Sequence, residues 1–379
     1  MERREFIKCI VQGGCAYALM KSAVEFVTPS TSPMTALAEN STKLKECMFY
    51  KKLDGLRIEC EICPKKCRVA DMERGYCGNK ENHGGKYYTL VYSRPCAIHT
   101  DPIEKKPLFH YLPGTTAFSL ATAGCNFECK FCQNWEIAQF RPEQVDSIYL
   151  SPEDVCREAK RKGAPSVACT YSEPVVFYEY MHDIAVYGRK IGINTVMISN
   201  GFIQKEPMEE LCKYLAAVKI DLKAFTEKFY KDTCSGELKP VLDTLQLLKN
   251  RGMWFEIVVL IIPTLNDSKK EIREMCQWIV KNLGRDVPVH FSRFHPTYKI
   301  KNLPITPIST LEMARNTAMN EGVNFAYIGN VPGHPGESTY CPNCRKKIIG
   351  RIGYYITSIG IKKGRCVYCN HSIPGIWEM

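Results

Sequence analysis

Alternation of short apolar runs with helix-length amphipathic segments, from about residue 116 onward, constrains the fold of this chain more than any other feature. Parallel neighbours in a sheet need a crossover helix between them, so the alternation predicts a parallel α/β sheet. Six or seven units fall short of the eight that close a barrel. We therefore expect a partial, TIM-like (β/α)6-7 barrel, with an open doubly wound sheet as the alternative. The runs cover 115–124, 166–174, 194–201, 217–225, 254–263, 287–296 and, as a seventh candidate, 323–330.

The chain divides into four predicted regions. Residues 1–43 are a signal-like or disordered segment and linker, 44–114 a cysteine-rich N-terminal module, 115–332 the barrel core, and 333–379 a zinc-ribbon-like C-terminal module. Within the core, SPEDVCREAKRKG has the signals of a helix that begins after Ser151, with Pro152 in its first turn, and ends at Gly163.

The chain carries 20 cysteines in 379 residues, an unusual number, and most of them fall into three tight groups at metal-ligand spacings. Disulfides rarely cluster in this way, so the pattern indicates a reducing, metal-rich setting. The formal net charge of +11 is spread along the chain, which favours solubility and an anionic cofactor or partner. The groups are Cys60/Cys63/Cys67/Cys77, Cys125/Cys129/Cys132 and Cys341/Cys344/Cys366/Cys369.

The middle group lies on one short loop directly after the first predicted strand. Three thiolates, from Cys125, Cys129 and Cys132, can bind three irons of a cubane cluster and leave the fourth iron open to a reactant. The alternative is a closed zinc or ferredoxin-like site whose fourth ligand comes from elsewhere, such as Cys96 or Cys169.

The spacing Cys-x3-Cys-x2-Cys, with Phe131 before the last cysteine, resembles the signature of the radical S-adenosylmethionine (SAM) superfamily. The wider text, DPIEKKPLFHYLPG at 101–114 and then ATAGCNFECKFCQNWEIAQ, is similar to AmmeMemoRadiSam-system radical SAM enzymes, which are related to pyruvate formate-lyase activating enzymes. The resemblance implies a radical SAM barrel, a [4Fe-4S] cluster, SAM and a low-potential electron donor. It also implies cleavage of SAM to a 5′-deoxyadenosyl radical that abstracts hydrogen from a substrate.

The resemblance leaves the substrate open. Activation of a glycyl-radical enzyme is one implied role, and modification of another protein, an RNA or a metabolite is the other. A metal-stapled nucleic-acid-binding protein is the non-enzymatic alternative, prompted by the basic charge balance.

Several strand ends carry groups that suit SAM. Glu173 could accept hydrogen bonds from the SAM ammonium, and Asn200 could bind ribose hydroxyls. Asp221 and Lys223 match the Asp-x-Lys motif of glycyl-radical activating enzymes, although a buried ion pair is the alternative. His290 is a further candidate, with a purely structural histidine as the alternative.

The two outer cysteine groups predict further metal sites. The C-terminal group forms two CxxC pairs and has the layout of a zinc ribbon, with an auxiliary iron–sulfur cluster as the rival. For the N-terminal group, zinc and an auxiliary iron–sulfur cluster both remain open.

The N-terminus raises the question of compartment. RREFIK at 3–8 and the weakly apolar stretch after it resemble a twin-arginine export signal. The chain lacks a run of about 18 uninterrupted apolar residues, so we expect no membrane span. SAM and low-potential electrons are cytoplasmic supplies, so we favour a cytoplasmic location over export.

Overall fold

This computed structural model describes residues 44–378 of the chain. Its central element is an eight-stranded sheet, whose strands lie between residues 97 and 329. Strands β8 to β14 are parallel, and β7 pairs antiparallel with β8. Each of the seven predicted runs contains one of the parallel strands, which confirms the predicted α/β class. The bounds are β7 Ala97–Pro102, β8 Thr116–Ala121, β9 Ser166–Cys169, β10 Asn194–Ser199, β11 Ala217–Asp221, β12 Phe255–Ile261, β13 Val289–Arg293 and β14 Ala326–Gly329.

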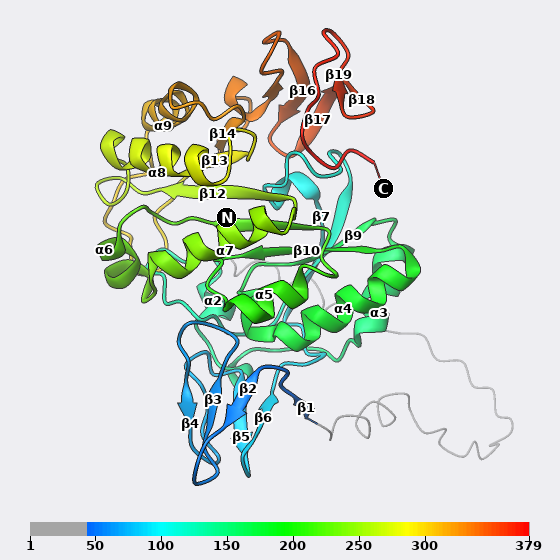
Figure 1. Ribbon diagram of the computed structural model, residues 1–379, viewed down its shortest axis with the longest axis vertical. Helices are drawn as coiled ribbons and strands as arrows, with labels where there is room; N and C mark the ends of the chain where they lie inside the picture. Colours follow the sequence, from blue (N-terminus) through cyan, green and yellow to red (C-terminus); the bar gives the residue numbers. More distant parts are fainter. Residues whose placement is uncertain (1–43, 379) are drawn as a thin grey trace, which may run out of the picture. The chain divides into compact units, whose positions relative to one another are not determined.

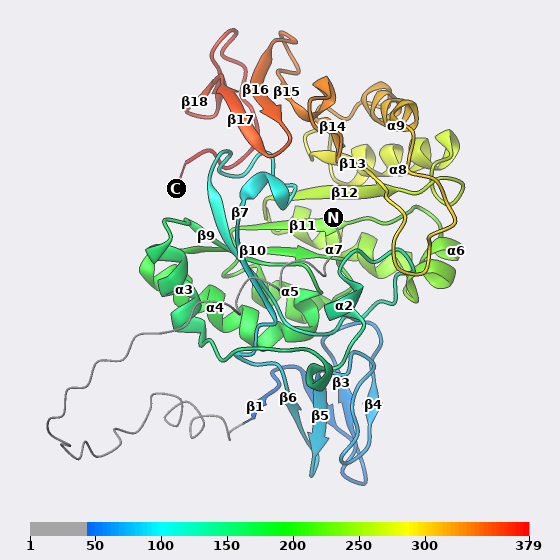
Figure 2. The ribbon, with the colours of Figure 1, turned by 180° about the vertical axis from the view of Figure 1, so that it is seen from behind.

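Strand order decides between the two predicted architectures. The strands follow one another in the sheet as they do in the sequence, whereas a doubly wound sheet reverses its order at a switch point. The partial barrel is therefore confirmed, with β7 and β14 as its two edges. The crossover helices α4, α5 and α7 lie together on one face of the sheet (Figures 1 and 2). The helices are α3 Pro152–Arg161, α4 Tyr178–Ile191, α5 Lys205–Leu211, α7 Leu238–Asn250, α8 Lys269–Asn282 and α9 Ile308–Asn320.

Local sequence signals explain where these helices begin and end. The Ser151 hydroxyl accepts a hydrogen bond from the Asp154 backbone N–H at 3.1 Å, and Pro152 occupies the first turn of α3. Gly192 adopts a left-handed conformation, with φ of 75°, at the end of α4. The short elements are η1 Ile103–Lys105, α2 Trp135–Ala138, η2 Pro142–Gln144, η3 Pro174–Phe177, α6 Glu227–Phe229, η4 Tyr230–Cys234 and η5 Pro335–Glu337.

Small sheets lie at the two ends of the described chain, blue and red in Figure 1. The N-terminal ones pair β2 with β3 and β4, and β1 with β6 and β5; the C-terminal ones pair β15, β16 and β17, and β18 with β19. Their bounds are β1 Lys45–Glu46, β2 Tyr50–Lys52, β3 Ile58–Cys60, β4 Arg68–Val69, β5 Lys80–His83, β6 Lys86–Thr89, β15 Thr339–Tyr340, β16 Lys347–Ile352, β17 Tyr355–Ile359, β18 Ile361–Lys362 and β19 Arg365–Cys366.

Two features concern the ends and borders of the predicted regions. Strand β7 comes from the range 44–114 that we assigned to the N-terminal module, yet it lies in the central sheet and covers the open edge of β8.

Between residues 44 and 378, no helix combines the length and the apolar character needed to cross a membrane. The export-like segment and the linker predicted in 1–43 lie outside the described residues.

Candidate active site and metal centres

A cavity of about 430 Å³ opens at the C-terminal ends of the parallel strands. Its walls come from the loop after β8, the ends of β9 to β13, and the segment after β7. Charged side chains occur at these ends, as in β11, where Lys219 and Asp221 lie among the last three residues of the strand. The cavity volume lies in the range of small-molecule sites, and its position is the one where barrels of this kind carry their chemistry.

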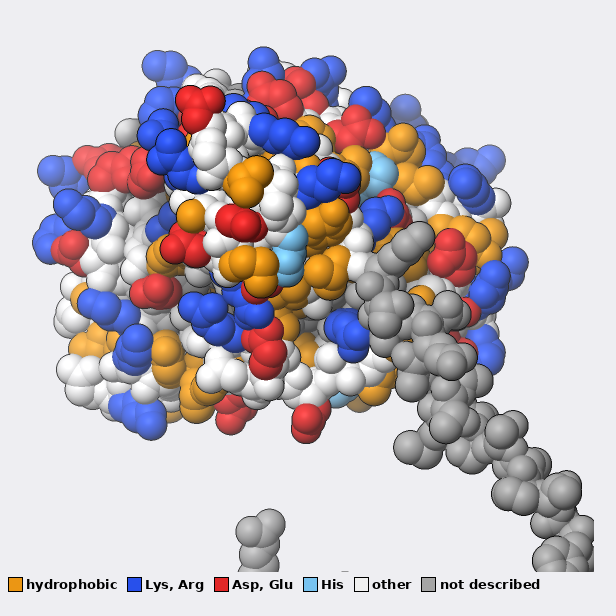
Figure 3. Space-filling view, turned by 90° about the horizontal axis from the view of Figure 1, so that it is seen from below, with side chains coloured by type: hydrophobic (Ala, Val, Ile, Leu, Met, Phe, Trp, Pro, Cys, Tyr) orange, Lys and Arg blue, Asp and Glu red, His pale blue; other side chains and the backbone are white. Residues whose placement is uncertain are grey.

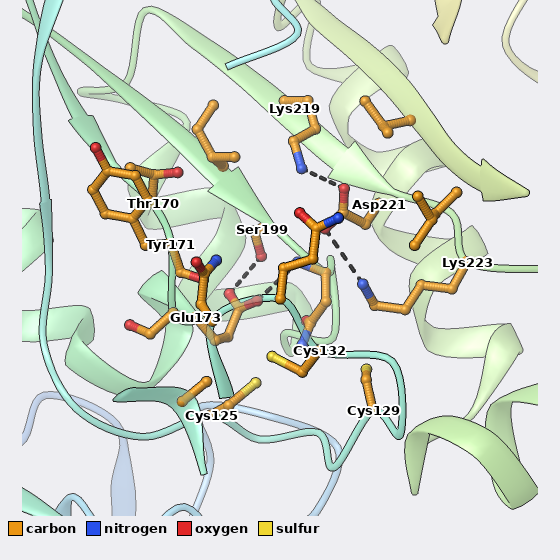
Figure 4. Close-up of a pocket in the computed structure, with 18 of the residues that line it drawn as sticks. Cys125, Cys129, Cys132, Thr170, Tyr171, Glu173, Ser199, Lys219, Asp221 and Lys223 are labelled. Atoms are coloured by element: carbon orange, nitrogen blue, oxygen red, sulfur yellow. Dashed lines mark hydrogen bonds and ion pairs between the residues drawn. The ribbon is translucent and has the colours of Figure 1, made fainter. Parts of the chain in front are cut away.

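Cys125, Cys129 and Cys132 all line this cavity (Figure 4). Gly124 begins their loop with φ of 91°, and a Cβ there would lie 2.5 Å from Asn79 Oδ1, so the chain needs glycine at this turn. The backbone N–H groups of residues 128 and 130 donate to the carbonyls of residues 234 and 233, which ties the loop to η4. The three thiols are therefore held in place by backbone contacts.

The environment of these thiols favours metal binding. Burial raises the pKa of Cys125 well above its usual value and that of Cys132 to about 11, so a cation is what would stabilise their thiolates. The thiol of Cys234 lies within hydrogen-bonding reach of Cys129 and is the main cause of a lowered Cys129 pKa. Among the described residues that line the cavity, there is no fourth cysteine.

The proposed alternative ligands Cys96 and Cys169 do not reach this cavity. Cys169 is buried at the end of β9 and does not line it, and Cys96 lines a different pocket with Arg94 and Glu143. Cys234, beside Cys129, is a cysteine close to this group that the sequence did not single out.

Three charged side chains form one row at the cavity wall, two of them at the end of β11 and the third two residues after it. Asp221 accepts from the ammonium groups of Lys219 and, at 3.3 Å, Lys223 (Figure 4). Burial alone would raise the Asp221 pKa, but the two lysines hold it below its ordinary value. The predicted pair Asp221 and Lys223 is thus at the cavity, and Lys219 joins it. The period-two pattern Lys-x-Asp-x-Lys could have identified Lys219 from the sequence.

Glu173 anchors the neighbouring strand ends. Its carboxylate accepts from Ser199 Oγ at 2.6 Å and from the Asn200 and Val175 backbone N–H groups at 2.8 and 3.1 Å. Burial raises the pKa of Glu173 to about 7 in spite of these donors. Asn200 also lines the cavity, but its amide donates to Asn126 Oδ1 at 2.8 Å and accepts from a backbone N–H at 2.9 Å.

The segment after β7 adds a second basic group that the sequence did not single out. Lys106 Nζ lies 2.5 Å from Asp101 and 4.3 Å from the centroid of the Tyr171 ring. Burial lowers the pKa of Lys106 to about 8, although Asp101 opposes this change. Lys105 lies beside it and pairs with Asp101 at 2.9 Å. Both lysines line the cavity, so it is basic on two walls.

His290 lies outside the cavity. It is buried, its Nε2 lies 2.7 Å from Glu256 Oε2, and its ring stacks on Tyr327 at 4.9 Å. His290 is the second residue of β13. Ser292, two residues later on the same side of the strand, does line the cavity. Its position does not support the predicted contact with SAM, because the strand continues beyond it before the cavity begins.

The C-terminal cysteines form a compact quartet. Among the residues described, they are the one group of three or more His, Cys, Asp or Glu whose ligand atoms all lie within 4.8 Å of one another. The Cys341–Cys369 and Cys344–Cys366 sulfur distances are 3.6 and 3.8 Å. Four thiolates ~2.3 Å from one zinc ion lie about 3.8 Å apart. The quartet can therefore hold a metal ion.

The N-terminal cysteines also come together. Cys60, Cys63, Cys67 and Cys77 line one small cavity with Lys80, between the N-terminal strands and η3.

Comparison with known proteins agrees with this geometry. A model of the Radical SAM superfamily matches residues 119–279. An uncharacterized protein of Methanocaldococcus jannaschii is 46% identical over 332 residues, which are 87% of this chain and 99% of that protein. The pyruvate formate-lyase-activating enzyme of Clostridium pasteurianum is 25% identical over 181 residues, 45% of this chain and 72% of that enzyme.

Among solved structures, a radical SAM methyltransferase from Sphaerobacter thermophilus has a TM-score of 0.46 and 13% identity, over 60% of this chain and 71% of that one. The superfamily implies a [4Fe-4S] cluster and SAM, and the three cysteines at the cavity fit that requirement. The chain belongs to the radical SAM superfamily and is homologous to pyruvate formate-lyase activating enzymes.

Proposed function

We propose that this chain is a radical SAM enzyme whose loop cysteines hold a [4Fe-4S] cluster with one open iron, and whose cavity binds SAM beside it. The observation that carries the proposal is that the described residues lining the cavity at the strand ends include three cysteines, and not four. When bound, the cluster and SAM together supply a carbon radical that abstracts hydrogen from a substrate.

The residues of the cavity suit a zwitterionic ligand. Lys219 and Lys223 supply positive charge for the SAM carboxylate, and Glu173 supplies an acceptor for its ammonium. Asp221 keeps both lysines in place through its ion pairs. Buried Phe127 and Phe131 line the cavity next to the cysteines and exclude water from the reacting atoms.

Activation of a glycyl-radical enzyme is the leading candidate for the reaction. It is supported by the homology to the Clostridium pasteurianum activating enzyme and by the Asp221-x-Lys223 motif at the cavity. Modification of another protein, an RNA or a metabolite is the second candidate. Membership of the AmmeMemoRadiSam group stays a prediction from the resemblance.

We further propose that the C-terminal quartet holds zinc. Both sulfur–sulfur distances match the edge of a zinc tetrahedron, and four thiolates leave no open coordination position. The site is thus a structural one.

Production of 5′-deoxyadenosine tests the main proposal. Protein purified anaerobically and mixed with dithionite and SAM should form it, and Cys132→Ala should reduce the rate at least about 100-fold, because the cluster loses one of three ligands. Cys212→Ala is the matched control, since this half-buried cysteine lies away from the three groups. Equal rates in Cys132→Ala and wild type would contradict the proposal.

The substrate is tested by the same assay. Addition of a candidate glycyl-radical protein should produce a glycyl radical in electron paramagnetic resonance (EPR) spectra and increase 5′-deoxyadenosine in proportion. A partner that increases 5′-deoxyadenosine without such a radical would favour the second candidate.

A further inference from the structure

The N-terminal quartet differs from the C-terminal one in the spacing of its thiols. Within residues 44–378, no three of the sulfurs of Cys60, Cys63, Cys67 and Cys77 lie within 4.8 Å of one another, whereas all four C-terminal sulfurs do. One zinc ion draws its four thiolates together, but an iron–sulfur cluster binds them on different irons and keeps them farther apart. The same wider spacing holds for Cys125, Cys129 and Cys132.

Backbone donors surround the N-terminal sulfurs. Cys67 Sγ accepts from the Tyr76 backbone N–H at 3.3 Å. The backbone N–H groups two residues after Cys60, Cys63 and Cys77 oppose the rise in pKa that burial causes at these thiols. Such N–H groups stabilise thiolates that carry the negative charge of a cluster.

The same donor pattern occurs at the loop of the main site. Cys125 accepts from the Phe127 N–H at 3.4 Å. The N–H of Asn134 likewise opposes the rise in the pKa of Cys132 that burial causes. Two separate cysteine groups therefore share both a wide spacing and a two-residue N–H pattern.

Protein atoms also shield the N-terminal cavity from water. Buried Ile62, Val175, Val176 and Tyr87 line it with the cysteines. Gly75 lies against Cys67 and Tyr87, and a Cβ there would lie 2.5 Å from the Tyr87 hydroxyl. The backbone at this point has no room for a side chain, so the wall of the cavity is closely fitted.

The two cysteine groups are joined by direct contacts. Asn126, which follows Cys125, lines the N-terminal cavity and reaches Cys63 with its side chain. Asn79 Nδ2 donates to the Ala123 carbonyl at 2.5 Å, just before the loop. Lys65 Nζ donates at 2.5 Å to the carbonyl of residue 235, next to Cys234.

We propose that Cys60, Cys63, Cys67 and Cys77 hold an iron–sulfur cluster, and that it passes electrons to the cluster at the main site. The electron-transfer role rests on the proposed function, whereas the assignment of a cluster to the four cysteines does not. One electron moves from a low-potential one-electron donor to the N-terminal cluster and then to the main one. No bond is formed or broken, and no proton is transferred.

The loop variant Cys125→Ala/Cys129→Ala/Cys132→Ala tests the site itself, because it leaves all four N-terminal ligands intact. Anaerobically purified variant should keep roughly half of the wild-type iron and acid-labile sulfide, and dithionite should give an EPR signal that SAM does not change. Loss of all iron and sulfide, or two zinc ions per chain, would overturn the proposal. This outcome is independent of SAM cleavage by the wild type.

The reciprocal variant Cys63→Ala/Cys77→Ala should keep the SAM-sensitive signal and lose the other. The control variant Cys212→Ala/Cys276→Ala should match the wild type in both EPR signals. If the reciprocal variant does not fold, the loop variant still decides the question.

Electron exchange is tested in the fully reduced wild type. Asn126 adjoins Cys125 and contacts Cys63, so two paramagnetic clusters at these sites should lie close enough to interact. The wild-type EPR spectrum should therefore differ from the sum of the two variants' spectra. A wild-type spectrum equal to that sum would contradict the electron-transfer role and leave the metal assignment standing.

Discussion

At the scale of single residues, Glu173 is the group whose protonation most directly affects the cavity. Its carboxylate is buried, accepts three hydrogen bonds, and has a pKa raised to about 7 by burial. A carboxyl group with this pKa changes charge near neutral pH, unlike an exposed glutamate. The ionised form is the one that would bind the SAM ammonium.

We therefore expect SAM affinity to rise with pH. From pH 6 to pH 8 the ionised fraction of a group with a pKa of about 7 increases about tenfold, so the SAM dissociation constant should fall by a similar factor. Glu173→Gln should remove this dependence, and Asp243→Asn, on the exposed surface, should retain it. Calorimetric titration at several pH values measures it, and equal profiles in wild type and Glu173→Gln would exclude this role.

Cys234 offers a second test at this scale. It lies beside Cys129 but does not line the cavity, so Cys234→Ala should retain the iron content and the response of the EPR signal to SAM. Cys129→Ala should lose the response to SAM and the share of the iron that the main cluster holds. If Cys234→Ala also loses the SAM-responsive cluster, Cys234 is a fourth ligand, and the open iron that the proposed function requires does not exist.

At the scale of elements, β11 places Lys219 and Asp221 on one face because side chains two residues apart on a strand point the same way, and Lys223 follows two residues after the strand ends. The side chain of Lys219 is 7% exposed, and that of Lys223 is 14% exposed. Burial of two ammonium groups is costly unless a carboxylate pairs with them. Asp221 therefore stabilises the two buried lysines through its ion pairs, in addition to lining the cavity.

Asp221→Ala should destabilise the protein. Removal of one partner from a buried pair leaves uncompensated charge, and we expect the free energy of unfolding to fall by about 3 kcal/mol, the low end for such changes, because Asp221 partly faces the cavity. Chemical denaturation measures the difference. Lys239→Ala breaks an exposed i,i+4 pair in α7 and should leave stability unchanged. Similar values for both variants would contradict a stabilising role of the row.

At the scale of the whole molecule, the C-terminal sheets are joined to the segment that brings lysines to the cavity. Arg351 donates to the Phe109 carbonyl at 2.8 Å, and Ile376 exchanges backbone hydrogen bonds of 2.7 Å with residues 110 and 112. Tyr354, in the turn between β16 and β17, lines the cavity. The C-terminal sheets that carry the cysteine quartet thus support one wall of the candidate active site.

Loss of the quartet should act at this scale. Cys344→Ser/Cys369→Ser should remove one zinc ion per chain, leave iron unchanged and lower the melting temperature, because the small sheets have too little core of their own. Metal analysis and thermal unfolding measure these effects. A loss of iron with unchanged zinc would show that the quartet holds a cluster.

The sequence alone determined the parallel α/β class and the three cysteine groups, and it favoured the partial barrel that strand order in the structure then confirmed. These depend on local patterns: strand and helix periodicity, and ligand spacing within short loops. The same locality explains why Asp221 and Lys223 could be placed together, since they lie two residues apart at the end of β11.

Tertiary structure decided which distant groups meet. Lys106 and Cys234 reach the main site from segments whose sequence gives no periodic signal, and His290 falls short of it because its strand extends further than the motif reveals. The separation of sulfurs that distinguishes the two outer quartets likewise depends on packing between loops, which ligand spacing along the chain does not specify.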